Sequence, residues 1–166
     1  MKLEKPGITI DIPGHGEMHL RRIVSDYTGT LSYRGRLVDG VDERLRALGE
    51  LLDIHILSAD TRGTAKEQLS GLPLQVHILS GTDHDVQKRD FAARFDLRQV
   101  AAFGNGANDR LLLKAVKQAG GLAVAVENGE GCAIDTQLNA HIFIVGASHA
   151  LDLLVDTKFV TATLRY

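Results

Sequence analysis

The stretch Leu20-Arg21-Arg22-Ile23-Val24-Ser25-Asp26-Tyr27-Thr28-Gly29-Thr30-Leu31 decides the fold, because an apolar run ends there in an aspartate and a turn. The run from Leu20 to Val24 predicts a strand, and a carboxylate at its end can attack phosphorus as a nucleophile. Gly29 lets the turn bend closely around transferred oxygens, so that backbone N–H groups can bind them. The segment therefore predicts phosphoryl chemistry at Asp26.

Outward from this stretch, short apolar runs alternate with helical patterns. The predicted strands are 8–12, 18–25, 54–57, 74–79, 100–103, 122–126 and 141–145, and the predicted helices are 41–52, 61–69, 85–95, 108–119 and 148–155, with Ile134 closing another short helix. The first two strands are expected to form an antiparallel hairpin through the turn Pro13-Gly14-His15-Gly16. The alternation that follows predicts an α/β fold, with a mainly parallel, Rossmann-like sheet covered by helices on both faces. No linker divides the chain, so residues 1–166 are predicted to form one domain, with 1–19 as an N-terminal hairpin extension.

The composition excludes several classes of function. The 166 residues carry a net charge of -2, so no basic surface for nucleic acid is expected. No apolar stretch approaches the roughly 20 residues that span a bilayer, and residues 1–6 lack the apolar core of a signal peptide. Cys132 is the single cysteine, which excludes an internal disulfide and is typical of a reducing compartment. We therefore expect a cytoplasmic protein without a nucleic-acid or membrane partner.

Three later segments place polar groups at the ends of predicted strands or the starts of helices. They are Ser58-Ala59-Asp60, the helix start that carries Lys88, and the loop Gly104-Asn105-Gly106-Ala107-Asn108-Asp109. In a parallel sheet, ligands bind beyond the carboxyl ends of the strands. Together with Asp26 these segments offer a nucleophile, a hydroxyl and an ammonium for phosphate, and hard oxygen ligands for Mg²⁺.

The order of these motifs resembles the haloacid dehalogenase-like (HAD) superfamily, and more closely the phosphorylation domain of P-type ATPases. Those pumps carry Asp-Lys-Thr-Gly-Thr-Leu where this chain has residues 26–31, and Thr-Gly-Asp where it has 58–60. They carry Gly-Asp-Gly-x-Asn-Asp where it has 104–109. The resemblance covers about residues 20–155 and is similar to the soluble, P-type-ATPase-like group, which implies a Rossmann-like catalytic core.

The resemblance also implies a role for each matching residue. Asp26 would form an aspartyl-phosphate, and Asp109 would hold either the metal shell or Lys88 in place. Grouped by role, the implied residues are catalytic Asp26, Thr28, Ser58 and Lys88; phosphate-binding Thr28, Gly29, Ser58, Ala59 and Lys88; and metal-binding Asp26, Thr28, Asn105 and Asp109. The cofactor so implied is Mg²⁺, and the substrate is a phosphorylated compound of undefined identity.

Three positions depart from the family pattern. Thr28 stands where many HAD phosphatases have an acid–base aspartate, a loss worth about 10²–10⁴-fold in rate, so slow turnover is expected. Asn105 replaces an acidic metal ligand, which predicts weaker Mg²⁺ binding, and Tyr27 replaces the lysine of the pumps. We therefore predict a slow Mg²⁺-dependent phosphohydrolase. A non-catalytic phosphate- or Mg²⁺-binding module and a soluble ATPase-like hydrolase stay open as alternatives.

Structural roles compete with these assignments. Asp60 or Thr61 can cap the helix that follows, and Asn108 can do so for the next one. Lys66 and Arg89 are rivals of Lys88 as the phosphate-facing cation. The spacing of the seven histidines does not predict a transition-metal site.

The segment between the first two motifs is short. Residues 32–53 have room for one helix and its loops but for no sizeable cap domain, so the mouth of the site is expected to be open. A homo-oligomer or a large substrate would then cover it. The apolar side of the hairpin, with Ile8, Ile10 and Ile12, is either a subunit contact or packs on the core.

Overall fold

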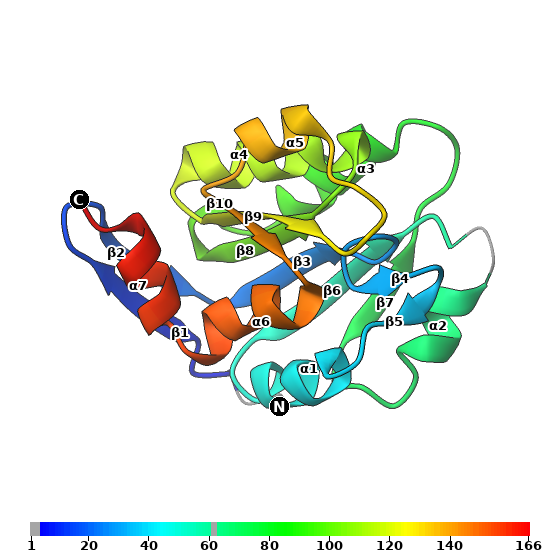
Figure 1. Ribbon diagram of the computed structural model, residues 1–166, viewed down its shortest axis with the longest axis horizontal. Coiled ribbons are helices and arrows are strands. Elements are labelled where there is room, and N and C mark those ends of the chain that lie inside the picture. Colours follow the sequence, from blue (N-terminus) through cyan, green and yellow to red (C-terminus); the bar gives the residue numbers. More distant parts are fainter. Residues whose placement is uncertain (1–3, 61–62) are drawn as a thin grey trace.

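A computed structural model describes residues 4–60 and 63–166 and contains a six-stranded parallel sheet (Figure 1). Its strands run in the order β10-β9-β8-β3-β6-β7, and every neighbouring pair is parallel. Their bounds are β3 Arg22–Asp26, β6 Asp53–Ser58, β7 Gln75–Ile78, β8 Val100–Gly104, β9 Leu122–Glu127 and β10 Ile142–Val145. The predicted α/β fold is confirmed.

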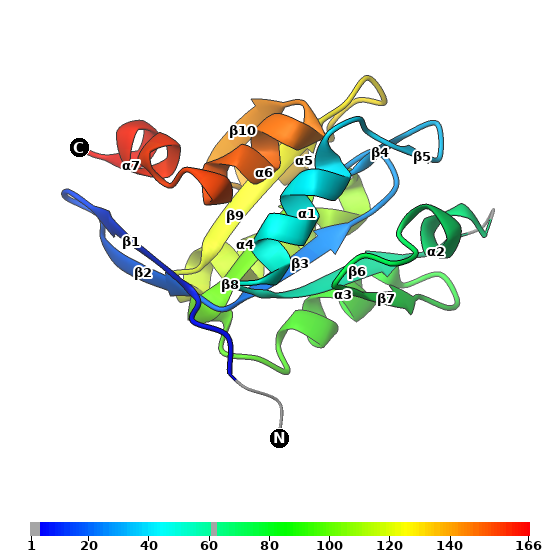
Figure 2. The same ribbon diagram turned by 90° about the horizontal axis from the view of Figure 1, so that it is seen from below.

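Helices cover both faces of this sheet (Figures 1 and 2). One face carries α1 (Val41–Gly49) and α6 (Ala147–Val155), and the other carries α3 (His84–Ala92), α4 (Arg110–Ala119) and α5 (Ile134–Leu138). A short helix, α2 (Thr64–Gln68), follows β6. Two 3₁₀ turns, η1 (Leu97–Gln99) and η2 (Ala107–Asp109), precede β8 and α4.

The central strand β3 is buried on both sides because it lies between two apolar layers. Successive side chains of a strand point to opposite faces, so Ile23 joins the cluster under α1 and α6 while Val24 joins the cluster under α3 and α4. Both side chains have no exposed surface. This double burial explains why Ile23 and Val24 are both apolar.

The N-terminal hairpin forms, but its second strand is shorter than predicted. Strands β1 (Ile8–Ile12) and β2 (Gly16–Leu20) pair antiparallel as a separate two-stranded sheet. The prediction of one strand over 18–25 is wrong, because the chain leaves the hairpin at Arg21 and enters the parallel sheet as β3. There the Arg21 N–H donates to Gln99 O (2.8 Å), and its carbonyl accepts from Asp53 N (3.0 Å).

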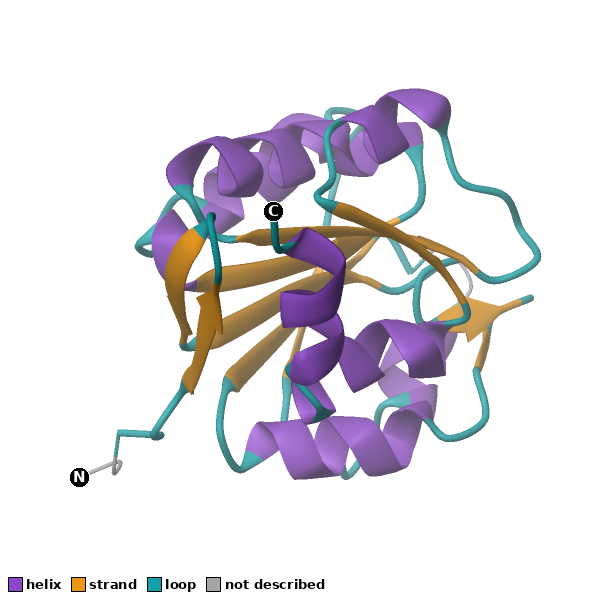
Figure 3. Cartoon of the chain, turned by 60° about the vertical axis from the view of Figure 1, so that its left-hand side comes forward, coloured by secondary structure: helices purple, strands orange, loops and turns teal. Residues whose placement is uncertain are grey.

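The apolar side of the hairpin packs within the chain. Ile8, Ile10 and Ile12 belong to the main core cluster and are at most 8% exposed. A C-terminal helix that periodicity did not predict, α7 (Lys158–Leu164), lies beside β1 (Figure 3). The interpretation of this face as a subunit contact is therefore wrong, and core packing is confirmed.

Smaller differences concern element ends. Ile134 begins α5 instead of closing a helix, and Thr61, predicted to begin a helix or cap one, lies outside the described residues. A small unpredicted hairpin, β4 (Ser32–Tyr33) and β5 (Arg36–Leu37), follows the Asp26 turn. Throughout residues 4–60 and 63–166, the helices are too short or too polar to cross a membrane.

Candidate active site

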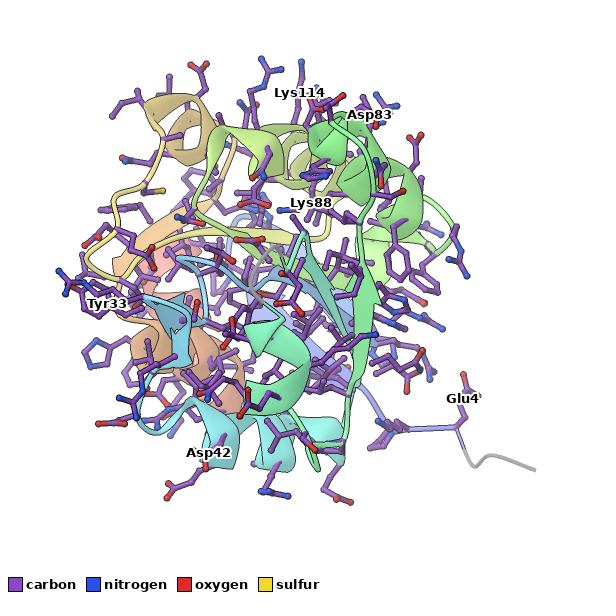
Figure 4. All side chains as sticks on the ribbon, turned by 90° about the vertical axis from the view of Figure 1, so that its right-hand side faces the viewer. Glu4, Tyr33, Asp42, Asp83, Lys88 and Lys114 are labelled. Atoms are coloured by element: carbon purple, nitrogen blue, oxygen red, sulfur yellow. The ribbon has the colours of Figure 1, made fainter. Side chains whose placement is uncertain are left out.

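Three charged side chains from separate elements meet at the carboxyl edge of the sheet. The Lys88 ammonium on α3 donates to Asp26 Oδ1 at 2.8 Å and to Asp109 Oδ1 at 2.7 Å. Lys88 is 1% exposed, Asp26 6% and Asp109 0%. In Figure 4 Lys88 lies inside the molecule, whereas Lys114 projects from the surface. Of the three cations, Lys88 is the one in contact with Asp26, whereas Lys66 is exposed and Arg89 pairs at the surface with Asp90.

The two carboxylates keep Lys88 charged in the interior. Burial lowers the pKa of Lys88, but the negative charges of Asp26 and Asp109 and their hydrogen bonds outweigh burial and raise it above its ordinary value. The ammonium is thus a permanent cation beside the Asp26 carboxylate.

The Asp26 carboxyl holds its proton to a higher pH than an ordinary aspartate, because its pKa is raised. Burial and the charge of Asp109 raise the pKa of Asp26 to about 6, against the lowering effects of Lys88 and Thr30. The result is a carboxylate that is weakly solvated and partly uncompensated, since one lysine is shared by two acids. An additional cation or a phosphate-bound metal would favour its ionised form.

The Gly-rich loop is tied to this cluster by Asp109. Asp109 Oδ2 accepts from the backbone N–H groups of Asn105 and Gly106, each at 3.0 Å, while its Oδ1 binds Lys88. Gly104 allows this approach, because a Cβ there would collide with the Asp109 side chain. Both Asp109 oxygens are engaged within the chain, so the geometry favours its predicted role of holding Lys88 over direct metal ligation.

Thr30 is a site residue to which sequence reasoning assigned no role. Its hydroxyl lies 3.1 Å from Asp26 Oδ2 and 3.0 Å from Asn105 Oδ1, and its single proton can serve one of them at a time. Thr30 thereby joins the first and last motifs. Thr30 lies four residues after Asp26 within the first motif, and this position is the sequence feature from which a role in the site could have been predicted.

The turn between Asp26 and Thr30 is shaped by Gly29. Gly29 has φ 76°, and a Cβ there would collide with the Asn105 side-chain amide. Glycine is therefore required both for the backbone conformation and for the approach of the last motif. Thr28 is exposed at this turn, whereas Tyr27 is buried and its hydroxyl donates to Gly35 O at 3.0 Å. Tyr27 thus packs inward where the pumps have a lysine.

Ser58 lies at the same edge of the sheet, because it follows Leu57, the residue paired with Asp26. Ser58 is buried and its Oγ accepts from Asp60 N at 3.0 Å, which leaves its proton for another acceptor. Ala59 is half-buried beside it. Asp60 Oδ1 accepts from Ala65 N at 2.9 Å, so this side chain stabilises the start of α2 as the capping alternative predicted.

The oxygen donors at this edge fit a hard divalent cation in their chemistry. Asp26 supplies a carboxylate, Asn105 an amide oxygen and Thr28 a backbone carbonyl in the adjoining turn, a set that suits Mg²⁺ completed by water. In the part of the chain that the structure describes, no group of three or more His, Cys, Asp or Glu side chains could hold a metal. The site therefore has few negative ligands.

The strand order of the sheet and the helices on both of its faces are those of the HAD-like fold, which several solved phosphatase structures share. The 3-deoxy-D-manno-octulosonate 8-phosphate phosphatase of Moraxella catarrhalis, solved with magnesium, phosphate and KDO, shares it with a TM-score of 0.65 and 14% identity over 86% of this chain and 92% of that one. The cobalt-bound phosphatase of Haemophilus influenzae has a TM-score of 0.64 and 14% identity, over 89% of this chain and 94% of that one. The corresponding Yersinia pestis phosphatase has a TM-score of 0.60 and 17% identity over 95% of both chains.

At the level of sequence, no family model and no curated protein matches the chain. At 14–17% identity these structures establish the HAD-like fold and not an activity. The closer resemblance to P-type ATPases stays a prediction.

Proposed function

We propose that the chain is a Mg²⁺-dependent phosphohydrolase that acts through an aspartyl-phosphate on Asp26. The observation that carries this proposal is the buried Asp26–Lys88–Asp109 cluster at the carboxyl edge of the sheet. A purely structural ion pair would gain little from burial, because the desolvation of three charges offsets their attraction. A nucleophile beside a fixed cation, in contrast, needs this arrangement.

In the proposed reaction an Asp26 carboxylate oxygen forms a bond to phosphorus while the bond from phosphorus to the substrate oxygen breaks. Lys88 and the Ser58 hydroxyl stabilise the phosphoryl oxygens, and the backbone N–H groups of the turn at Gly29 add to them. Mg²⁺ bound by Asp26, the Thr28 carbonyl and Asn105 would neutralise the repulsion between the carboxylate and the phosphate. Asp109 and Thr30 keep Lys88 and Asp26 oriented.

Hydrolysis of the aspartyl-phosphate is then the slow step. Thr28 offers no carboxylic acid to protonate the leaving oxygen or to activate water, and both tasks benefit from one. The substrate is proposed to be a phosphate monoester. The structural neighbours are named for the phosphorylated sugar 3-deoxy-D-manno-octulosonate 8-phosphate, which makes phosphorylated sugars the first compounds to test. A cytoplasmic location remains part of the proposal.

The proposal is tested by phosphate release from a panel of phosphate monoesters, with and without Mg²⁺, by the wild type and by Asp26→Asn. We expect Mg²⁺-dependent release by the wild type and none by the variant, and an acid-stable phosphoenzyme only in the wild type. Thermal unfolding of both proteins checks that the variant folds. Equal release by both would remove Asp26 from the mechanism.

A second function is favoured by Thr28 and Asn105, which weaken catalysis and metal binding without disturbing the cluster. It is a non-catalytic module that binds phosphate or Mg²⁺. No release by the wild type, together with phosphate binding measured by calorimetry and lost on Lys88→Met, would establish it.

A further inference from the structure

The edge strand β10 presents an apolar surface that the fold leaves uncovered. Strand β10 hydrogen-bonds only with β9 among the described strands, so its other edge is unpaired. Ile142 and Ile144 pack on the core under α6, and Phe143 and Val145 therefore point to the opposite face. These two side chains are 47% and 58% exposed.

Helix α5 lies on the same face of the sheet, against β9, the neighbour of β10, and carries further exposed apolar side chains. It contacts α4, and its Ile134 and Leu138, one helical turn apart, are 66% and 72% exposed. We call Ile134, Leu138, Phe143 and Val145 the β10 patch. With roughly 150–200 Å² of surface for a large side chain, these fractions leave roughly 400 Å² of apolar surface, which is in the range of roughly 300–600 Å² for the largest and often functional patch of a monomer.

The charge pattern indicates what covers the patch. From Thr136 to Leu151 the chain has no Asp, Glu, Lys or Arg, although the protein as a whole is 24% charged. In a two-fold interface each residue near the axis faces its own copy, so any charge there would meet a like charge. A neutral strand fits a second copy of itself; the nearest charged groups, Asp135 on α5 and Lys117, which donates to Ala140 O at 2.8 Å, lie outside β10.

The edge also lacks the usual devices against strand pairing. Natural edge strands carry lysine, proline or bulges, and β10 has none of these. The opposite edge, β7, is preceded by Pro73 and exposes a single large apolar side chain, Ile78. Both edges are unpaired among the described strands, and β10 is the one that exposes more apolar side chain surface.

We propose that two copies of this chain associate through antiparallel pairing of their β10 strands, which joins the two sheets and buries the β10 patch of each. The apolar side chains supply about half of the roughly 800 Å² that each partner contributes to a standard interface, and the strand backbones and flanking polar residues supply the rest. The proposal does not depend on the phosphatase activity.

Sedimentation velocity of the full chain over a range of concentrations tests this, with Phe143→Lys as the probe and Ile78→Lys as the matched control. The two residues have similar exposure, 47% and 44%, and lie on opposite edge strands. We expect wild type and Ile78→Lys to be dimers and Phe143→Lys to be a folded monomer that still unfolds cooperatively, at a lower melting temperature because association no longer stabilises it. A monomeric wild type, or a dimer that survives Phe143→Lys, would overturn the proposal.

A second measurement needs no substitution and covers the case in which Phe143→Lys unfolds. Hydrogen exchange of the wild type should show β10 amides that gain protection as concentration rises, while β7 amides do not change. Protection that is independent of concentration in β10, or that appears in β7 instead, would also overturn it.

Discussion

Two groups of ionisable side chains lie beneath the same helix, α3, one buried and one partly buried, and they differ in charge. Lys88 joins Asp26 and Asp109 at the carboxyl edge. Toward the other end of the helix, Phe91 packs against His55 of β6, and the His55 Nδ1 atom lies 3.1 Å from His77 Nε2. The first group contains opposite charges and keeps its lysine charged, whereas the second contains only histidines, whose lowered pKa values favour the neutral form.

The two pKa shifts differ in sign because of the charges of the neighbouring side chains, and not because one group is more deeply buried. Burial and the adjacent His77 lower the pKa of His55 to about 4; the charge of Asp53 opposes this shift, and the charges of Arg22 and Arg94 add to it. Arg22 lies over the Phe95 ring at 4.5 Å. Lys88 is buried more deeply, yet its pKa is raised because two carboxylates surround it. Burial removes charge unless the opposite charge is buried with it.

The largest expected effect comes from breaking the charged group. Lys88→Met leaves two buried carboxylates without a cation, so we expect a loss of about 3–5 kcal/mol of unfolding free energy and of all phosphate release. Urea unfolding measures the first quantity. The control Lys114→Met removes an exposed lysine and should change stability by less than about 0.5 kcal/mol. Adding Asp109→Asn to Lys88→Met should restore part of the stability, and a Lys88→Met protein as stable as the wild type would refute the comparison.

The second prediction uses pH, because the two groups respond with opposite signs. His55 has a pKa of about 4 when folded and about 6.5 when unfolded, so its contribution is complete above pH 6.5 and is lost as pH falls toward 4, by at most about 3 kcal/mol. Asp26, with a folded pKa of about 6 above its ordinary 3.8, stabilises the fold as pH falls through the same window.

Unfolding free energies measured from pH 7 to pH 4 separate the two contributions. His55→Phe should lose less stability on acidification than the wild type, and Asp26→Asn should lose more. Parallel pH profiles for all three proteins would contradict the opposite protonation behaviour of the two groups.

The third prediction adds a carboxylate at position 28, in the turn beside the charged group. Thr28→Asp should speed hydrolysis of the aspartyl-phosphate by at least about tenfold, because a general acid and base then stands at the turn. Single-turnover kinetics separate formation of the intermediate from its hydrolysis. Thr28→Asn is the matched control and should leave hydrolysis slow. The idea fails if a folded Thr28→Asp protein forms the intermediate and hydrolyses it no faster.

The smallest effect is expected at the metal ligand. Asn105→Asp adds a negative ligand near Asp26 and should tighten Mg²⁺ binding about tenfold while lowering stability in the absence of Mg²⁺. Calorimetric titration measures the affinity, and thermal unfolding with and without Mg²⁺ measures the linked stability. Unchanged affinity would mean that Asn105 does not face the ion.

The sequence predicted the strands of the sheet and the edge at which the site lies. Ile23 and Val24 are apolar because β3 is buried on both faces, and such runs are legible without a structure. The end of the hairpin at Arg21 could not be predicted from the sequence, since it depends on hydrogen bonds to Gln99 and Asp53, which belong to other elements. Helix α7 was missed because it is held by packing on β1 and not by a strong periodicity of its own.

What the sequence by itself determined was the fold class and the set of chemical groups delivered to the carboxyl edge. Local periodicity encodes the strands, and parallel pairing brings their ends together whatever the loops contain. Only the tertiary structure decided which cation contacts Asp26 and which buried groups carry charge. It also placed Asp109 where its carboxylate binds Lys88. Lys88 lies 62 residues from Asp26 and 21 from Asp109 in the chain. Protonation depends on distances of a few ångströms and on burial, and neither quantity exists until the chain has folded.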